Sequence, residues 1–204
     1  MSSRVKDLVR KVLRDRNRRS EALAGGSGSP ALSFSWETLS PEFAEKIVSA
    51  KMVAAFMPLS DEPDISDVLS YFVTRGASLC FPKVNGEEMA FFQADPSSCR
   101  EIGSFGILEP EDGSEEVKIA DIDLVLVPAM AFDGNGVRLG RGKGYYDKCF
   151  SQGKSGFSGV FIGVSAKKNL FGHLPFDVWD LTVDAILTEE GLKETGEKER
   201  SSGK

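Results

Sequence analysis

Apolar and polar residues alternate along the chain with two different periods, which predict helices and strands in turn. Residues 4–19 carry apolar side chains at the spacing of one helical face. These side chains are Val5, Leu8, Val9, Val12 and Leu13. Basic side chains stand at every fourth position beside this stripe and form a cationic ridge: Lys6, Arg10, Arg14 and Arg18.

Capping residues and a helix-ending glycine mark two further helices. Ser40-Pro41-Glu42 places a capping serine before a proline, which predicts a helix that runs to about Lys51. Residues Ile65–Arg75 have helical spacing and stop at Gly76. The glycine-rich segment 25–30, between the first two helices, predicts a flexible loop.

Short apolar runs that end at prolines, glycines or polar turns predict six strands. Residues 109–120 are acidic and polar and predict a loop, and the polar residues 189–204 predict a frayed end. A proline closes three of the runs, at Pro58, Pro82 and Pro128. The six predicted strands are Val53–Met57, Ser78–Phe81, Met89–Gln93, Asp123–Val127, Gly159–Val164 and Asp184–Thr188.

The order of these elements predicts an α/β fold. Apolar strands separated by helices are typical of a doubly wound, mostly parallel sheet with helices on both faces. A chain of 204 residues suits a single domain, which we expect over 1–190, with 191–204 as a polar tail. Sheets of this kind bind ligands beyond the carboxyl ends of their strands.

Composition excludes several classes of protein. Hydrophobic residues make up 41% and charged residues 27%, as in ordinary globular domains. No stretch approaches the ~20 apolar residues of a membrane helix, and the N-terminus has no signal-peptide core, so we expect no membrane partner. Cys80, Cys99 and Cys149 form no C-x-x-C pair, which favours free thiols and a cytoplasmic location. His173 is the only histidine, so a metal here needs oxygen ligands, which favours Mg²⁺.

The charge is unevenly distributed. Residues 1–20 hold eight Lys or Arg against Asp7 and Asp15, a net charge of +6. The total is −6, so the remainder carries −12. A basic end on an acidic body predicts a local anion site and no nucleic-acid partner.

One glycine-rich segment carries the candidate chemistry. After the strand that ends at Pro128, Arg138, Arg141 and Lys143 alternate with glycines, and a helix begins near Lys143. Glycines let backbone N–H groups approach an anion, and arginines offer forked donors to phosphate oxygens. The segment therefore predicts a polyphosphate cradle, although it matches neither G-x-x-x-x-G-K-[ST] nor G-x-G-x-x-G. A glycine-rich turn with solvated basic side chains is the structural alternative.

The string from Arg138 to Asp147, RLGRGKGYYD, resembles the signature of the 5-formyltetrahydrofolate cyclo-ligase (methenyltetrahydrofolate synthetase) family. Further matches follow in the expected order over about residues 5–190. They are Lys6-Asp-Leu-Val-Arg10, Met57-Pro-Leu-Ser-Asp-Glu62, Phe105-Gly-Ile-Leu-Glu-Pro110, Leu174-Pro, Asp180 and Val183-Asp184. The chain departs from the family at Trp179, where a histidine is frequent, and in a variable connection over 20–38.

The resemblance implies an ATP- and Mg²⁺-dependent enzyme. 5-Formyltetrahydrofolate becomes 5,10-methenyltetrahydrofolate, through phosphorylation of the formyl oxygen and attack by N10, with release of ADP and phosphate. Phosphoryl transfer depends on positioning and charge neutralisation, so the lack of a histidine base is no obstacle. The expected partner is a reduced folate, and we expect a monomer.

The resemblance also assigns roles to residues. Arg141, Lys143 and Tyr145 are the catalytic candidates. The ATP-binding candidates are Lys6, Arg10, Arg138, Gly140, Arg141, Gly142, Lys143, Gly144, Tyr145 and Tyr146. The folate-binding candidates are Met57, Glu62, Phe105, Arg141 and Tyr145, and the candidate Mg²⁺ ligands are Asp147 and Asp184, with Asp133 as a weaker one.

Each role has a simpler structural alternative. Lys6 and Arg10 suit a solvated helix face, and Tyr145 suits a packed aromatic at a helix start. Met57 and Phe105 suit core packing. Asp147 suits a helix N-terminus, and Asp184 suits the turn before a strand.

Two other functions remain open at this stage. One is an ATP-dependent phosphotransferase or ligase on the same scaffold with a different small-molecule acceptor. The other is a nucleic-acid-binding module built on the basic helix, against which the acidic remainder of the chain argues.

Overall fold

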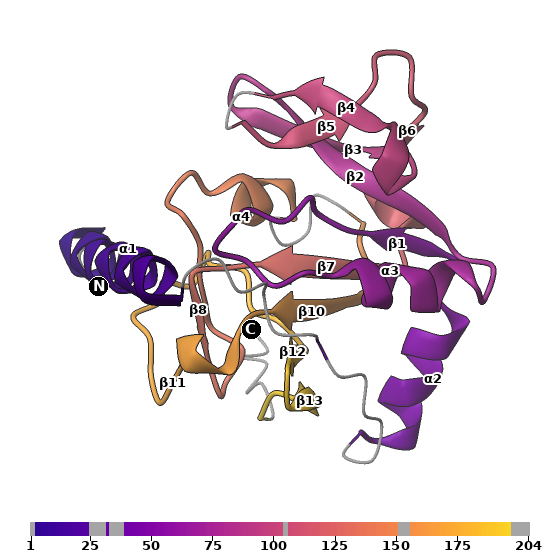
Figure 1. Ribbon diagram of the computed structural model, residues 1–204. Helices are drawn as coiled ribbons and strands as arrows, with labels where there is room; N and C mark the ends of the chain where they lie inside the picture. Colours follow the sequence, from indigo (N-terminus) through magenta and orange to yellow (C-terminus); the bar gives the residue numbers. More distant parts are fainter. Residues whose placement is uncertain (1–2, 25–31, 33–38, 104–105, 151–155, 197–204) are drawn as a thin grey trace.

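A computed structural model describes residues 3–24, 32, 39–103, 106–150 and 156–196 (Figure 1). Its centre is an eight-stranded sheet in the order β13-β12-β10-β7-β1-β2-β3-β6. The five inner strands from β12 to β2 run parallel, and β13, β3 and β6 are antiparallel at the two edges. The eight strands are β1 (Met52–Ala54), β2 (Ser78–Asn85), β3 (Glu88–Gln93), β6 (Glu116–Val117), β7 (Leu124–Pro128), β10 (Val160–Val164), β12 (Ala185–Thr188) and β13 (Gly191–Glu194).

Helices and two small sheets surround this sheet. The α-helices are α1 (Ser3–Ala24), α2 (Pro41–Ser49), α3 (Ser66–Val73) and α4 (Tyr145–Cys149). Short 3₁₀ turns are η1 (Pro96–Ser98), η2 (Ile119–Asp121) and η3 (Lys167–Asn169). One small sheet joins β8 (Ala131–Asp133), β9 (Arg138–Leu139) and β11 (Leu170–Phe171), and the other joins β4 (Cys99–Ile102) and β5 (Leu108–Pro110).

Alternate side chains of the parallel strands build a core on each face of the sheet, because successive strand residues point to opposite sides. Leu124 and Leu126 of β7 pack on the face that α2 and α3 cover. Val125 and Val127 pack on the other face, where α4 contributes Tyr146. The predicted doubly wound α/β class, with helices on both faces, is confirmed.

The start of α2 follows its sequence signal. The Ser40 hydroxyl oxygen accepts the Phe43 N–H at 3.4 Å, and Pro41 stands in the first turn. The helix ends at Ser49, two residues before the expected Lys51, and α3 ends at Val73, two residues before Arg75. Both helices are otherwise where the pattern predicts them.

Three predictions about loops and strand ends are wrong. β2 does not stop at Pro82 but continues to Asn85. Its neighbour β1 ends at Ala54, which pairs with Cys80, so no strand on that side needs a donor from Pro82. The loop predicted at 109–120 contains all of β6 and parts of β5 and η2. The end predicted to fray contains β13, which pairs antiparallel with β12, while 197–204 lie outside the described residues.

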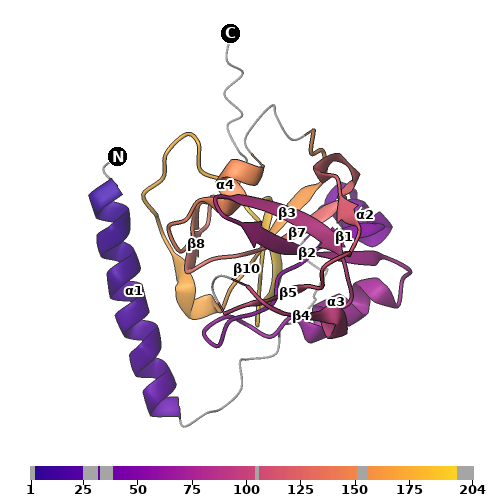
Figure 2. The ribbon, with the colours of Figure 1, turned by 90° about the horizontal axis from the view of Figure 1, so that it is seen from above.

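Helix α1 is present and lies along one side of the body (Figure 2), but its apolar stripe is not the side that packs most closely. Lys6, Leu13 and Asn17 are buried, whereas Leu8 is 63% and Val12 58% exposed. Lys6 and Arg10 of the cationic ridge therefore reach toward the body, whereas Arg14 is exposed and most of the apolar stripe faces solvent. The helix also extends to Ala24, into the connection expected at 20–38, and the glycine-rich loop at 25–30 lies outside the described residues.

Other properties of the described residues agree with the composition. No helix among them combines the length and apolarity that a membrane span requires. Cys80, Cys99 and Cys149 are all free.

Gly163 of β10 sets how closely the β8–β9 hairpin approaches the sheet. The fully buried ring of Phe132, in β8, lies against it, and a Cβ at Gly163 would be 2.6 Å from that ring. β9 continues into the glycine-rich segment. The contact between Gly163 and Phe132 therefore helps to set how far that segment lies from the sheet.

We expect Gly163→Ala to lower the free energy of unfolding by about 1–3 kcal/mol, because the added methyl group overpacks the Phe132 contact. Urea denaturation measures this. Gly172→Ala is the matched control, since nothing lies within 4 Å of a Cβ at Gly172. Equal stability of the two variants would show that Gly163 is not required for this packing.

Candidate active site

A cavity lies where the order of strands reverses. From β1 the chain first adds β2 on one side, and then β7 and β10 on the other, so β1 and β7 flank the switch point. A cavity of about 510 Å³ opens there, between Phe56 and Met57 beyond β1 and Pro128 and Ala129 at the end of β7. This is the location at which doubly wound sheets bind ligands.

The cavity wall divides into a cationic and an apolar part by the elements that supply it. Helix α1 and the segment around β9 bring basic side chains, namely Lys6, Arg10, Arg138, Arg141 and Lys143. The segment after β1, together with β2, β3 and the approach to β5, brings apolar side chains, namely Phe56, Met57, Leu59, Pro82, Val84, Met89 and Ile107. A ligand with an anionic end and a flat apolar end would match both parts.

The glycines of the cradle have identifiable steric reasons. Gly142 has φ of +101° and Gly144 has φ of +68°, a region that side chains with a Cβ rarely adopt. At Gly140 a Cβ would lie 2.9 Å from Nη1 of Arg138. Gly144 directly precedes α4. This helix starts at Tyr145, two residues after the start expected near Lys143. Each of these three glycines, which alternate with basic residues, is therefore favoured by a positive φ or by a close neighbour.

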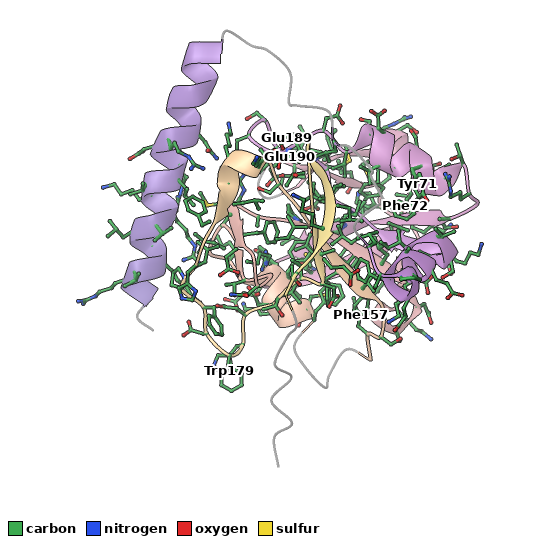
Figure 3. All side chains as sticks on the ribbon, turned by 90° about the horizontal axis from the view of Figure 1, so that it is seen from below. Tyr71, Phe72, Phe157, Trp179, Glu189 and Glu190 are labelled. Atoms are coloured by element: carbon green, nitrogen blue, oxygen red, sulfur yellow. The ribbon has the colours of Figure 1, made fainter. Side chains whose placement is uncertain are left out.

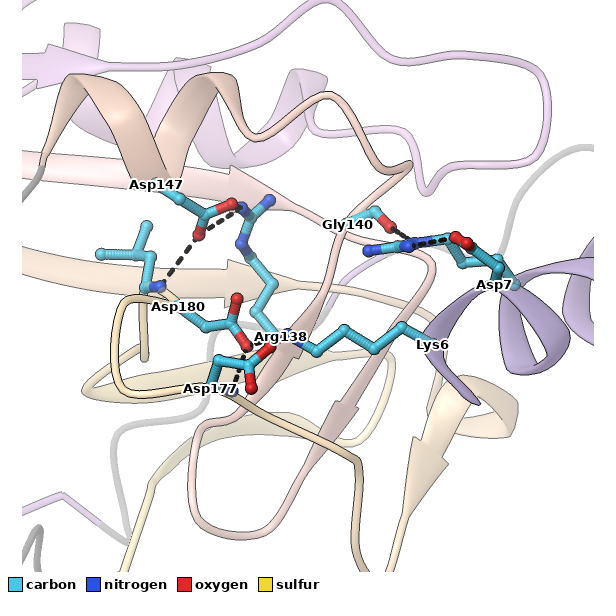
Figure 4. A network of polar contacts seen from close by, with 9 residues as sticks. Lys6, Asp7, Arg138, Gly140, Asp147, Asp177 and Asp180 are labelled. Carbon is cyan, nitrogen blue, oxygen red and sulfur yellow. Dashed lines mark hydrogen bonds and ion pairs between the residues drawn. The ribbon is translucent and has the colours of Figure 1, made fainter. Parts of the chain in front are cut away.

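Lys6 reaches the cavity from α1 and is only 8% exposed (Figure 4). Its ammonium donates to Asp177 at 2.8 Å and to Asp180 at 2.5 Å. Burial opposes the charged form of Lys6, but the hydrogen bonds to the two carboxylates outweigh it, so its pKa is raised. A solvated helix face, the alternative weighed above, does not describe this lysine.

Arg10 lies one turn along α1 and joins that helix to the cradle. Its Nε donates to the Gly140 carbonyl oxygen at 2.9 Å, and its Nη1 donates to Asp7 at 2.8 Å. The guanidinium carbon also lies close to where a Cβ of Gly142 would stand, at 3.5 Å. Arg10 thus contacts the glycine-rich segment through the backbone of that segment.

Arg138 and Asp147 form a forked ion pair on the cavity wall. Nη2 of Arg138 donates to both oxygens of Asp147 at 3.0 Å, and Asp147 also accepts the Leu181 N–H at 2.9 Å. The Arg138 guanidinium lies 5.3 Å from the centre of the Tyr146 ring. The buried charge of Arg138 is balanced within the protein, and this pair orients the start of α4.

Arg141 is held by two acidic residues that follow β1. It donates to Glu62 at 3.1 Å and also to Asp61. Glu62 in turn accepts the Leu59 N–H at 3.0 Å. Burial raises the pKa of the Glu62 carboxyl, against the opposing effects of the Leu59 N–H and the Arg141 charge.

The two predicted metal ligands lie at opposite ends of the sheet. Asp147 lines the cavity, but Asp184 precedes β12 and accepts the Phe161 N–H at 2.8 Å. Asp133, the weaker candidate, is fully buried and accepts backbone N–H groups, including that of Leu174 at 3.0 Å. Among the described residues no three His, Cys, Asp or Glu gather in a metal-binding group. A Mg²⁺ carried by a nucleotide needs only one or two carboxylates, so Asp147 fits that role and Asp184 does not.

Thirteen of the predicted site residues line this one cavity. The two neighbouring tyrosines, Tyr145 and Tyr146, have different surroundings. Tyr145 donates its hydroxyl to the Gly86 carbonyl oxygen at 3.2 Å, whereas the Tyr146 ring packs against Phe91 in the core. Phe105 lies outside the described residues. The residues brought together are Lys6, Arg10, Met57, Glu62, Arg138, Gly140, Arg141, Gly142, Lys143, Gly144, Tyr145, Tyr146 and Asp147.

Sequence reasoning missed the acidic partners of the cations. Asp61, Asp177 and Asp180 were given no role, although Asp61 adjoins Glu62 and Asp180 belongs to the C-terminal match. Each partner is far from its cation in the sequence, so no local pattern pairs them. Trp179, the departure beside Asp180, is 83% exposed and points away from the body (Figure 3).

The comparisons with known proteins identify the family of this chain. A model of the 5-formyltetrahydrofolate cyclo-ligase family matches residues 2–189. The chain belongs to this family. The 5-formyltetrahydrofolate cyclo-ligase of Mycolicibacterium smegmatis is 27% identical over 195 residues, which cover 92% of this chain and 95% of that protein. The cyclo-ligase of Mus musculus is 25% identical over 154 residues, or 70% of this chain and 75% of that protein.

Solved structures support the cyclo-ligase fold. The NMR structure of the 5,10-methenyltetrahydrofolate synthetase of Aquifex aeolicus matches with a TM-score of 0.66 and 29% identity, and covers 98% of this chain and 100% of that one. The predicted family and enzyme class are confirmed.

We expect Glu62→Gln to change how stability depends on pH. Because folding raises the pKa of Glu62, its contribution to stability is present below its ordinary value of 4.5 and is lost as the pH rises through the raised value. Without that carboxyl group, the variant gains stability relative to the parent between pH 4.5 and neutrality. Urea denaturation across this range measures the difference.

Glu45→Gln, on the exposed side of α2, is the control for exchanging a carboxyl group for an amide away from the cavity. A Glu62→Gln variant that loses stability relative to the parent as the pH rises would contradict the raised pKa.

Proposed function

We propose that this protein converts 5-formyltetrahydrofolate to 5,10-methenyltetrahydrofolate in an ATP- and Mg²⁺-dependent reaction that releases ADP and phosphate. The observation that carries the proposal is the single cavity at the switch point, whose wall is cationic on one part and apolar on another. Membership of the cyclo-ligase family supports the folate substrate. The fit of nucleotide and folate to the two parts of the wall follows from their chemistry.

The cationic part would bind the triphosphate. Lys6 and Arg10 approach from α1, and Arg141 and Lys143 approach from the glycine-rich segment. Arginine and lysine side chains in a partly buried cavity bind phosphate oxygens more strongly than exposed ones do. The glycines at 140, 142 and 144 leave their backbone accessible to the same anion.

The reaction itself needs positioning more than a protein nucleophile. The formyl oxygen attacks the γ-phosphorus, the bond from that phosphorus to the β-phosphate oxygen breaks, and ADP leaves. N10 then attacks the activated formyl carbon, the carbon–oxygen bond breaks, and phosphate leaves with the oxygen, while N10 loses its proton. Arg141, which is partly exposed at the cavity wall, would stabilise the charge on the transferred group.

Lys143 and Tyr145 are the remaining catalytic candidates. Both line the cavity, and Tyr145 stands where the cradle meets the turn at Gly86. In this position Tyr145 would separate the phosphates from the folate. Mg²⁺, when bound with the nucleotide, supplies charge neutralisation, and Asp147 is the carboxylate that would hold it.

The cellular setting belongs to the same proposal. Free cysteines at Cys80, Cys99 and Cys149 are in keeping with the reducing cytoplasm. A monomer with a reduced folate as its small-molecule partner remains our expectation.

The first test mixes the full-length protein with 5-formyltetrahydrofolate, ATP and Mg²⁺ and follows the absorbance of the methenyl product. We expect a rise that requires both ATP and the metal, with one ADP formed per product. Omission of ATP and addition of a chelator are the controls. ADP release without folate turnover would instead point to a phosphotransferase with a different acceptor.

We expect Arg141→Ala to lower kcat by about 10²–10³-fold, as loss of one donor to a transition-state charge does. The fold should survive, because the Arg141 side chain is 38% exposed. Arg100→Ala is the matched control: Arg100 is an exposed arginine that also pairs with a carboxylate, Glu111, outside the cavity. Turnover of Arg141→Ala equal to that of Arg100→Ala would remove Arg141 from the catalytic set.

A further inference from the structure

Glu109 is a buried carboxylate in the apolar part of the cavity wall. It stands in the middle of β5, is 6% exposed, and lines the cavity beside Val84 and Ile107. Charged side chains are almost never buried to this degree unless they are paired. Its surroundings therefore bear on what the cavity binds.

The hydrogen bonding of Glu109 within the described part of the chain is incomplete. One oxygen, Oε1, accepts the Val84 N–H at the long distance of 3.3 Å. The other oxygen, Oε2, has no hydrogen-bond partner among the residues that the structure describes. Burial raises the pKa of this carboxyl, against the opposing effects of the Val84 N–H and the Lys83 charge.

Lys83, whose positive charge acts on Glu109, is committed to other groups. Lys83 precedes Val84, and its ammonium donates to Glu101 at 2.5 Å, to the Pro110 carbonyl oxygen at 3.1 Å and to Asp112 at 2.7 Å. Lys83 therefore stabilises the β4–β5 hairpin and makes no ion pair with Glu109. The carboxylate is left facing the cavity.

The hairpin also makes room for this carboxyl group. Gly103 follows β4, and a Cβ at that position would lie 2.2 Å from Oε1 of Glu109. Any other residue there would displace the carboxyl group. The carboxylate is held between Gly103 and the backbone N–H of Val84. Its remaining side faces the open cavity.

We propose that Glu109 binds the substrate through the amino-pyrimidinone edge of the reduced pterin ring, where two neighbouring N–H groups point in one direction. A carboxylate accepts such a pair of donors with charge-assisted hydrogen bonds. Met57, Val84, Met89 and Ile107 line the same cavity and suit the faces of a flat ring. This inference rests on the proposed function, since it names the group that recognises the folate.

Glu62, a folate-binding candidate from the family resemblance, is less suited to hold the pterin edge in this structure. Its Oε2 accepts the Leu59 N–H and its Oε1 accepts Arg141. Both oxygens are thus engaged at the cationic part of the wall. Glu109 has the unused acceptor, and it stands among apolar side chains.

The test measures the equilibrium binding of 5-formyltetrahydrofolate and, separately, of ATP by calorimetry. We use the parent protein, Glu109→Gln and Glu109→Leu. The Gln variant keeps an acceptor but loses the charge, so we expect about a tenfold rise in Kd for the folate; the Leu variant loses both, so we expect up to about a hundredfold rise. The Kd for ATP should stay within about twofold of the parent value. Glu116→Gln, an exposed glutamate of β6, is the matched control.

A folate analogue without the 2-amino group completes a double-mutant cycle. If Glu109 binds that edge, the analogue binds the parent more weakly than the folate does, and the two Glu109 variants lose this discrimination. Discrimination that persists in both variants, or an equal loss of folate and ATP affinity, would overturn the inference and leave Glu109 a residue of the hairpin. Failure of the parent to bind the folate would instead overturn the proposed function.

Discussion

The balance of buried positive charge is the constraint on which this molecule depends. Lys6, Arg10, Arg138 and Arg141 all converge on one cavity, and each is paired with a carboxylate or a carbonyl oxygen. Without a partner, a buried cation would cost several kcal/mol, on the order of what a whole domain retains as net stability. The pairs therefore also dock elements: Lys6 joins α1 to the segment between β11 and β12, and Arg141 joins the cradle to the segment after β1.

The same pairs explain how one cavity serves both stability and binding. The carboxylates Asp61, Glu62, Asp177 and Asp180 neutralise the cations while no other anion is bound. A triphosphate brings more negative charge and more acceptor oxygens than these carboxylates offer, so it competes for the same donors. Binding of the triphosphate then replaces the ion pairs with carboxylates by ion pairs with phosphates. The cations are therefore paired both before and after binding.

Sequence patterns predicted the features that depend on neighbours along the chain. Strand positions, the Ser40 cap and the glycine-rich segment belong to this class, and so does the cavity at the carboxyl ends of the strands. The orientation of α1 depends on Asp177 and Asp180, which are more than 170 residues away from Lys6, and periodicity alone favoured the wrong face. The motif resemblance assigned Lys6 and Arg10 to an anion site, and both residues line the cavity. It could not supply their carboxylate partners.

Sheet polarity explains why Asp147 belongs to the site and Asp184 does not. Asp184 directly precedes β12 and accepts the N–H of Phe161 in the parallel neighbour β10. Asp123 does the same before β7, where it accepts the N–H groups of Lys51 and Met52 at the start of β1. Both aspartates follow an apolar residue and open a buried strand, so they satisfy donors at the amino ends of a parallel sheet. Ligands bind at the opposite ends, and Asp147 lines the cavity there because it comes after β7 and β9 in the chain.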